Sequence, residues 1–360
     1  MVDASTTKTV TKSVTYQDNL ILIKMKLIRN IKVPTGNICV GEGEKGKLEF
    51  LSIGDYGKDA NIKADFLGIT RELNGVPSGA IMPLSEKWVI TISTQYGCSM
   101  GCKFCDVPKV GKGVNATYHD MLDQILEGLR LHPEIRGTKR LNIHFARMGE
   151  PSFNGNVLDI ASCLRRNIYD FWGNTIAVHP VVSTMMPKNN KYLGRFLDIW
   201  CNDIKNNLYN GDAGLQLSIN STNESQREYM FSGNAMTLDE IAHEVCYLPK
   251  PKGRKYTLNF ALADEYEINA NKLSSLFSPE YFMCKITPIH KTQTSEENNI
   301  ETAWGYEEYT PYERAERDLI KAGFDVIVFV PSYDEDLGMI TCGNAILSGN
   351  NPKTKYTELI

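Results

Sequence analysis

The sequence predicts an α/β fold: a partial, open (β/α)6 barrel preceded by a small β-rich N-terminal region. From residue 87 onward, strand-like apolar runs alternate with helix-like segments, as in a parallel sheet covered by helices. The runs are nearly continuous in apolar residues, which is typical of strands buried on both faces. Six repeats are fewer than the eight of a closed α/β barrel, so the barrel is expected to stay open.

The N-terminal region is predicted over residues 1–85. Its apolar stretches at 20–28 and 46–53 alternate in polarity, and connections rich in Gly and Lys separate them, as in short strands joined by turns. The barrel is predicted over 86–350, and residues 351–360 are expected to form a tail.

The barrel elements follow in chain order, and the last predicted helix starts with Pro311 and ends near Gly323, the usual asymmetry of helix ends. Strands are predicted at 87–94, 140–148, 175–184, 213–220, 255–263, 282–289 and 325–332. Helices are predicted at 117–132, 154–172, 191–206, 237–248 and 311–324. Chemistry in such folds lies at the carboxyl ends of the strands.

Composition excludes several classes of protein. Nine cysteines among 360 residues are too few for a disulfide scaffold. The first residues lack the apolar segment of a secretory signal, and no run of about 18 apolar residues occurs. We therefore expect no membrane association, a cytoplasmic location and reduced thiols. A formal charge of −4 does not favour an extended electrostatic clamp on nucleic acid.

Cys98, Cys102 and Cys105 lie close together directly after the first barrel strand. A disulfide, a zinc site and an iron–sulfur cluster with one ligand missing are the three alternatives. Reduced thiols disfavour the disulfide. Structural zinc normally takes four protein ligands, but Cys163, the nearest further cysteine, lies in a predicted helix, and no histidine stands at finger spacing. A cubane cluster takes one thiolate per iron, so three cysteines leave one iron open.

The C-x3-C-x2-C spacing after a strand, with Phe104 before the last cysteine, resembles the radical S-adenosylmethionine (SAM) superfamily. The resemblance implies a [4Fe–4S] cluster on the three cysteines, whose open iron binds the amino and carboxylate groups of SAM. Electron transfer from the cluster then cleaves SAM to a 5′-deoxyadenosyl radical. A reductant such as flavodoxin or ferredoxin is also implied.

Further segments resemble one branch of this superfamily, the RlmN/Cfr family, which methylates adenosine in ribosomal RNA and, for RlmN, also in tRNA. They occur in the family's order over roughly residues 75–350. The similar segments are STQYGC (93–98), MGEP (148–151), VST (182–184), LSINSTNESQRE (217–228), CKITPIH (284–290) and TCGNAI (341–346).

This second resemblance implies roles for single residues. Gly149 and Glu150 would face the SAM amino group, and Cys342 would accept a methyl group from SAM. The remaining cofactor-binding residues implied are Phe104, which belongs to the cysteine motif, and Ser183, Ser218, Asn220 and His290. Each position also has an ordinary structural role: Glu150 before Pro151 can cap a loop, the serines and Asn220 are common turn residues, and His290 can be a surface histidine.

Two positions depart from the family. Its second cysteine, which breaks the covalent protein–RNA adduct, corresponds to Thr91, and its base corresponds to Ser78. A threonine hydroxyl is a much weaker nucleophile and leaving group than a thiol. The other cysteines are expected to be buried and inert, and His144 to be a packed residue; these cysteines are Cys39, Cys163, Cys201, Cys246 and Cys284.

Three functions are compatible with these residues. The first is methyl transfer through Cys342 to a nucleobase carbon of RNA or a nucleotide. The second is direct use of the 5′-deoxyadenosyl radical on a small molecule or peptide, favoured by Thr91, Ser78 and the acidic isoelectric point. The third is a non-catalytic iron–sulfur or zinc protein, against which the ordered set of SAM-contact positions argues.

Overall fold

The computed structural model describes residues 23–56, 81–173, 177–302, 310–330, 339–340, 346–349 and 358–359. Seven neighbouring strands run parallel and form the sheet predicted for the barrel. They are β6 (Trp88–Ile92), β9 (Leu141–Phe145), β10 (Val178–Thr184), β11 (Gly214–Ser218), β12 (Tyr256–Leu262), β13 (Phe282–Pro288) and β14 (Asp325–Val328). The α/β fold with a parallel sheet is therefore confirmed.

The β-rich N-terminal region is also confirmed. Its strands β1 (Lys26–Val33), β2 (Gly36–Gly43) and β3 (Gly46–Ile53) pair antiparallel, and β3 pairs antiparallel with β6. One 11-stranded sheet results, in the order β14-β13-β12-β11-β10-β9-β6-β3-β2-β1-β15. The division at residue 85 stays a prediction, since the described strands on both sides of it belong to one sheet. Within the predicted tail, β15 (Glu358–Leu359) pairs with β1.

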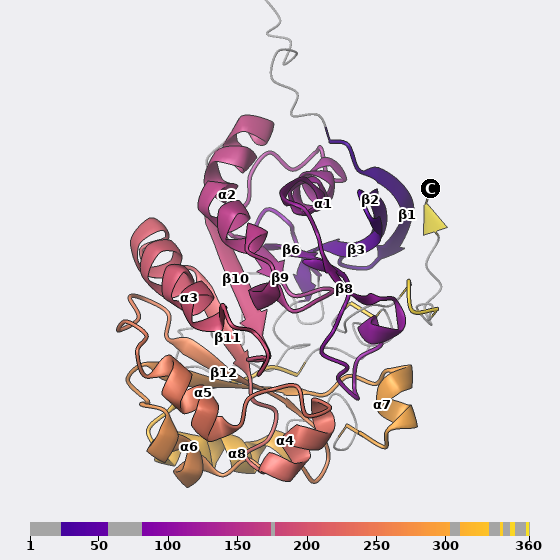
Figure 1. Cartoon of the computed structure of the whole chain (residues 1–360). Helices are drawn as coiled ribbons and strands as arrows, with labels where there is room; N and C mark the ends of the chain where they lie inside the picture. Colours follow the sequence, from indigo (N-terminus) through magenta and orange to yellow (C-terminus); the bar gives the residue numbers. More distant parts are fainter. Residues whose placement is uncertain are drawn as a thin grey trace, which may run out of the picture.

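All five predicted helices form, with one change of type. Figure 1 shows α1, α2, α3 and α5 following the strands in an arc. They are α1 (Tyr118–Arg130), α2 (Asn156–Trp172), α3 (Leu193–Asp198), which continues as the π-helix η4 (Ile199–Leu208), α5 (Leu238–Val245) and α8 (Thr310–Lys321). Three short helices were not predicted: α4 (Glu224–Met230), α6 (Ala270–Leu276) and α7 (Gln293–Glu297). No described helix is both long and apolar enough to span a membrane.

The helix faces correct part of the cysteine prediction. The buried residues of α2 include Ile160, Ala161 and Leu164, whereas Cys163 lies on the opposite side of the helix and is exposed. Cys246 stands at the C-terminal end of α5 and is exposed too. The prediction that these two thiols are buried is wrong. It was based on apolar neighbours in the sequence and did not consider on which face of the helix each cysteine lies. Cys39, Cys201 and Cys284 are buried as predicted.

The two faces of the parallel sheet differ in polarity. The face under the helices is apolar and buried, as at Leu258 and Phe260 of β12. Alternate residues point to the other side and are partly exposed. Parallel register places them on one inner face: Thr91, His144, Gln216, Ser218, Asn259, Lys285 and Thr287. The inner face of the sheet is therefore polar, whereas the face under the helices is apolar.

Candidate active site around the cysteine loop

The cysteine loop lies at the carboxyl end of β6, inside a small hairpin that was not predicted. Its strands are β7 (Gln95–Gly97) and β8 (Lys112–Asn115). Gly97 has φ +78°, and a Cβ at this position would lie 2.1 Å from the Gly111 carbonyl oxygen, so only glycine fits. The Cys98 N–H donates to the same Gly111 oxygen over 3.0 Å. The chain thus turns sharply into Cys98, Cys102 and Cys105.

Polar side chains from one distant turn hold this loop. Asn234 Nδ2 donates to the Met100 carbonyl over 2.8 Å, and Ser232 Oγ donates to the Gly101 carbonyl over 2.5 Å. Both anchors follow α4 in the chain. Sequence reasoning missed them, since their only signal was small polar residues after an unrecognised helix.

A second group of contacts comes from α7. Thr292 Oγ1 donates to the Phe104 carbonyl over 2.9 Å, and the Thr294 N–H donates to Asp106 Oδ1 over 3.0 Å. The cysteine loop is therefore fastened to the segments after both β11 and β13.

Apolar side chains surround the three thiols. Phe104 packs edge-on to Phe231 with ring centroids 5.9 Å apart, so this predicted cofactor contact forms part of the apolar wall. Cys102 is 5% exposed, and its Sγ lies 3.3 Å from Met185 Sδ. Further members of this cluster are Met100, Met230, Ala235, Ala263, Ile289 and Ile300.

Burial also controls the protonation of the thiols. It raises the pKa of Cys98 to about 12, that of Cys105 to about 11, and that of Cys102 well above its ordinary value. Hydrogen bonds from the backbone of Met100 and Gly149 lower the pKa of Cys98 and so oppose this rise. Iron binds thiolates, so loading would release protons.

The donor set suits an iron–sulfur cluster. It consists of thiols on one loop, an apolar wall, and backbone N–H groups directed at sulfur. Among the described residues, no three His, Cys, Asp or Glu side chains are arranged to hold a single metal ion. A cubane spreads its thiolates over different irons, so its ligands do not converge on one point.

Glu150 is a buried carboxylate beside the thiols. It is 1% exposed, and its two oxygens accept from the Ser152 N–H over 3.1 Å and the Met185 N–H over 2.9 Å. Its negative charge raises the pKa of Cys98 and Cys102, and its hydrogen-bond partner Met185 contacts Cys102 through sulfur. Burial in turn raises the pKa of Glu150. Glu150 does cap the short helix after it, yet a buried carboxylate also favours a cationic ligand.

Gly149 is required by the same turn. Its φ is +94°, and a Cβ would lie 2.5 Å from Gln95 Cβ. The Gln95 side chain accepts from the Glu150 N–H over 2.9 Å and donates to Asn115 Oδ1 over 2.8 Å. Gln95 was not predicted from the sequence as a site residue, although its side chain links the backbone of Glu150 to the hairpin residue Asn115.

Gly149→Ala should destabilise the fold markedly more than Gly233→Ala. Gly233 also has a left-handed φ, +70°, but its Cβ would meet no atom within 4 Å. Both variants carry the backbone cost of about 1–3 kcal/mol, and only Gly149→Ala adds overpacking of about 1–3 kcal/mol. Thermal unfolding of the two variants checks this. Equal losses would mean that Gln95 moves aside freely.

The other predicted SAM contacts lie at the same edge of the sheet. Ser183, on β10, is partly exposed and donates to Gln216 Oε1 over 3.3 Å. Ser218 ends β11 and is partly exposed. Asn220 is buried, and its Oδ1 accepts from the Ala261 N–H over 3.0 Å, so this amide ties two strand ends together.

His290 lies two residues after the end of β13. Burial, with a smaller contribution from Lys285, lowers the pKa of His290 to about 3, so its ring is neutral at pH 7. Thr91 lies on the inner face of β6, in register with His144 of β9. His144 is partly exposed there, and its pKa is lowered to about 3, mainly by burial. Ser78 and Cys342 lie outside the described residues.

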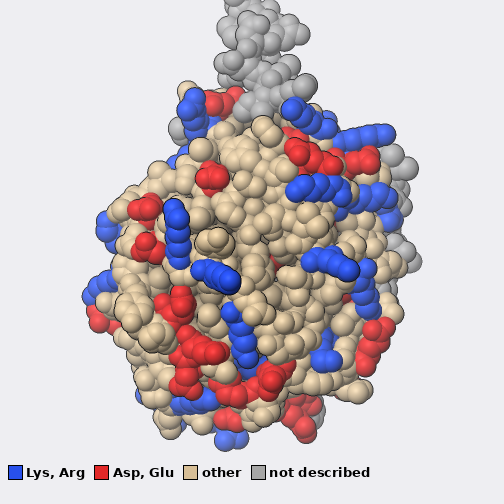
Figure 2. All heavy atoms as spheres, viewed as in Figure 1, with Lys and Arg blue, Asp and Glu red and all other residues tan. Residues whose placement is uncertain are grey.

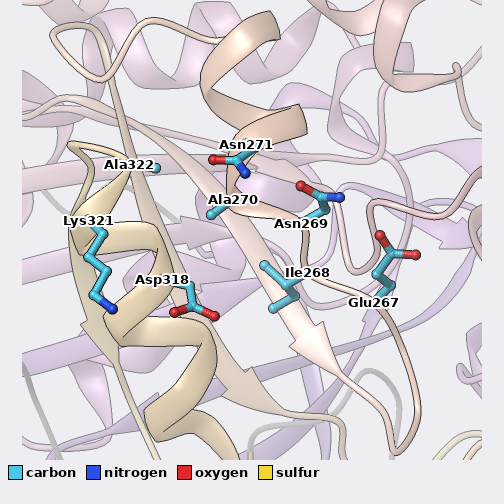
Figure 3. A pocket seen from close by; sticks show the side chains of 8 residues that line it. All are labelled: Glu267, Ile268, Asn269, Ala270, Asn271, Asp318, Lys321 and Ala322. Atoms are coloured by element: carbon cyan, nitrogen blue, oxygen red, sulfur yellow. The ribbon is translucent and has the colours of Figure 1, made fainter.

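A separate pocket of ≈ 420 Å³ lies between the start of α6 and α8 (Figure 3). Charges of both signs line it, from Glu267, Asp318 and Lys321. Its other lining residues are Ile268, Asn269, Ala270, Asn271 and Ala322, and none of the eight belongs to the cysteine loop or the Gly149–Glu150 turn.

Comparison with known proteins supplies the family. No family model matches the chain. It is 27% identical over 206 residues to a dual-specificity RNA methyltransferase RlmN of Solidesulfovibrio magneticus, covering 55% of this chain and 54% of that protein. It is 24% identical over 226 residues to a probable RlmN of Prochlorococcus marinus (strain NATL2A), covering 60% and 57%. A probable RlmN of Thermosynechococcus vestitus matches at 36% over 102 residues, 28% of this chain and 27% of that protein. The chain thus spans about half the length of these relatives or less.

The fold agrees with a solved structure. A crystal structure of a radical SAM methyltransferase from Sphaerobacter thermophilus superimposes with a TM-score of 0.56 and 17% identity, covering 84% of this chain and 76% of that one. At this identity the match shows the fold. Together with the sequence similarity, it means that the chain belongs to the radical SAM superfamily of enzymes and is a distant homologue of the RlmN methyltransferases.

Proposed function

We propose that Cys98, Cys102 and Cys105 hold a [4Fe–4S] cluster and that the chain transfers a methyl group through Cys342 to a nucleobase carbon of RNA or a nucleotide. The observation that carries the proposal is the packing of three loop thiols, Cys102 buried and the other two partly buried, beside the buried Glu150 carboxylate at one edge of the sheet. A bound cluster supplies, with a reductant such as flavodoxin or ferredoxin, the electron that cleaves SAM to a 5′-deoxyadenosyl radical.

The protein's own residues bind and orient SAM. Glu150 offers a fixed negative charge to the SAM ammonium, and Ser152 and Met185 hold its oxygens in place. Ser183 and Ser218 present hydroxyls on the partly exposed inner face. Asn220 holds the ends of β11 and β12 together through its hydrogen bond to the Ala261 N–H. The neutral ring of His290 offers a hydrogen-bonding group to SAM. The apolar wall around Phe104 shields Cys102 from water and reduces the exposure of the other two cysteines.

The methyl step rests on distant homology to RlmN methyltransferases. The Cys342 thiolate attacks the SAM methyl carbon, so that a sulfur–carbon bond forms while the sulfonium–methyl bond breaks and S-adenosylhomocysteine leaves. Because Thr91 stands where that family has its second cysteine, a covalent adduct with the substrate must be resolved by another group.

A second candidate is direct hydrogen abstraction by the 5′-deoxyadenosyl radical from a small molecule or peptide. Thr91 on the inner face favours it, because this position carries a hydroxyl and not the thiol that would resolve an adduct. The face in Figure 2 favours it as well: acidic and basic side chains are intermixed there, whereas a broad RNA-binding face would be basic.

Anaerobic reconstitution with iron and sulfide, followed by addition of SAM and dithionite, tests the proposal. We expect about four irons per chain, formation of 5′-deoxyadenosine, and one methyl group on Cys342 by mass spectrometry. Stoichiometric zinc without sulfide would refute the cluster. A 5′-deoxyadenosine that takes deuterium from a labelled substrate, and none from a labelled SAM methyl group, would select the second candidate.

A further inference from the structure

A buried ion pair joins the N-terminal strands to the turn that carries Glu150. Glu49 lies on β3 and is 0% exposed, and the side chain of Arg147, which follows β9, is 2% exposed. Arg147 Nε donates to Glu49 Oε1 over 3.0 Å, and Nη2 donates to the same oxygen. Burying such a pair carries a desolvation cost, which further hydrogen bonds to its members can offset.

Both members of the pair also bind the backbone of the C-terminal segment. Arg147 Nη1 donates to the Ile340 carbonyl over 3.2 Å, and Nη2 to the Met339 carbonyl over 3.3 Å. Glu49 Oε2 accepts from the Ile346 N–H over 2.9 Å. The same oxygen accepts from the Leu347 N–H over 3.3 Å. One ion pair thus fastens the chain on both sides of residues 341–345.

Apolar packing docks the same residues independently of charge. Ile340 and Ile346 are 4% and 6% exposed and share a cluster with residues of the N-terminal strands. Met339 and Leu347 pack against this cluster from its edge. Its other buried members are Ile31, Val33, Ile38, Val40 and Leu51, all from β1, β2 and β3. The N-terminal strands are therefore the platform on which this segment rests.

The ion pair also lies beside the cysteine loop. Arg147 precedes Met148, whose carbonyl accepts from the Thr94 N–H over 2.8 Å, and the Arg147 N–H itself donates to the Ile92 carbonyl over 3.0 Å. Its positive charge lowers the pKa of Cys105. A single rigid turn thus carries both the anchor of the C-terminal segment and the Glu150 carboxylate.

We propose that the Glu49–Arg147 pair is a positioning element for methyl transfer, which holds both ends of the Cys342-bearing segment beside the Glu150 turn. The N-terminal strands then serve the reaction as a docking platform. This inference rests on the proposed function, because it takes Cys342 as the methyl acceptor. Neither Glu49 nor Arg147 touches the reacting atoms; they act through the segment.

The double variant Glu49→Leu/Arg147→Met tests the pair without leaving one charge buried alone. Amide exchange at Ile346 and Leu347, followed by mass spectrometry, should accelerate roughly tenfold or more, since charged acceptors hold both N–H groups in the parent chain. Methylation of Cys342 by SAM should slow by a similar factor, while formation of 5′-deoxyadenosine stays within about twofold. Leu164→Ala is the matched control, because it empties buried volume in α2 and should change neither exchange at these amides nor methylation.

The outcomes separate the inference from the proposed function. Unchanged exchange at Ile346 and Leu347, or unchanged methylation of Cys342, in the double variant would overturn the positioning role. Parallel loss of SAM cleavage and methylation would also overturn it, since the pair would then support the fold in general. If the parent chain never methylates Cys342, the methyl-carrier function fails, and amide exchange still decides whether the pair docks the segment.

Discussion

Replacing Cys102 by alanine should leave the chain with almost none of its iron and no measurable SAM cleavage. Cys102 is the most deeply buried of the three loop thiols, and its loss leaves two protein ligands. Loss of an outer partner already lowers metal affinity about 10–100-fold, so loss of a ligand should exceed that. Iron and sulfide analysis after anaerobic reconstitution, with 5′-deoxyadenosine quantified by chromatography, gives the result.

Cys246→Ala is the matched control for this experiment. Its thiol is exposed at the end of α5, outside the loop, so iron content and SAM cleavage should be retained. Circular dichroism of Cys102→Ala should match that of the parent chain, because hydrogen bonds from Asn234 and Thr294 hold the loop without iron. Full iron content in Cys102→Ala would show that the ligands are misassigned.

Glu150→Gln should weaken SAM binding to the cluster-loaded protein by roughly a hundredfold or more. Removing one partner of a buried charge pair costs about 3–5 kcal/mol, and each 1.4 kcal/mol is a factor of ten in affinity. Glutamine keeps the shape of the side chain, but it has one acceptor oxygen for the two N–H groups of Ser152 and Met185. Equilibrium dialysis with labelled SAM measures the change.

Glu127→Gln provides the comparison. Glu127 is also buried, but its carboxylate pairs with Arg130 in α1, and in the described part of the chain no hydrogen bond or ion pair joins its side chain to a predicted site residue. The Glu127→Gln variant should be less stable than the parent chain and should bind SAM with the same affinity. If Glu150→Gln binds SAM as tightly as the parent chain with the same iron content, the carboxylate is only a cap of the helix after it.

Much of the fold could be predicted because the hydrophobic pattern is strong. The parallel strands are rich in apolar residues, of which those facing the helices are buried, and the long helices show a clear apolar stripe. The short helices α4, α6 and α7 span only 5–7 residues, too few for a period to appear, and capping side chains such as Asn223, Asn269 and Thr292 stabilise them. The polar inner face could have been predicted, because polar residues such as His144, Gln216 and Lys285 interrupt the apolar runs of the strands.

The candidate site, like the fold, could be predicted from the sequence only in part. The cysteine spacing and the resemblance to a known family single out three cysteines and Glu150 as candidates, because these residues lie in short local motifs. The partners that hold them come from far away: Asn234 is 134 residues from Met100, and Arg147 is 98 residues from Glu49. Such pairs carry no local pattern, because tertiary structure alone brings them together.

The hydrogen bonds that hold the cysteine loop affect what the loss of a bound cluster to oxygen would do to the protein. Its backbone is tied to the segments after β11 and β13 through Asn234, Ser232, Thr292 and Thr294, none of which needs a metal. Metal sites without such ties form only as the metal binds, and the chain unfolds when the metal leaves. The proposed cluster would therefore bind to a loop whose backbone these hydrogen bonds already hold. Its oxidative loss would leave these bonds in place, and we expect fresh iron and sulfide to restore it without new synthesis of the chain.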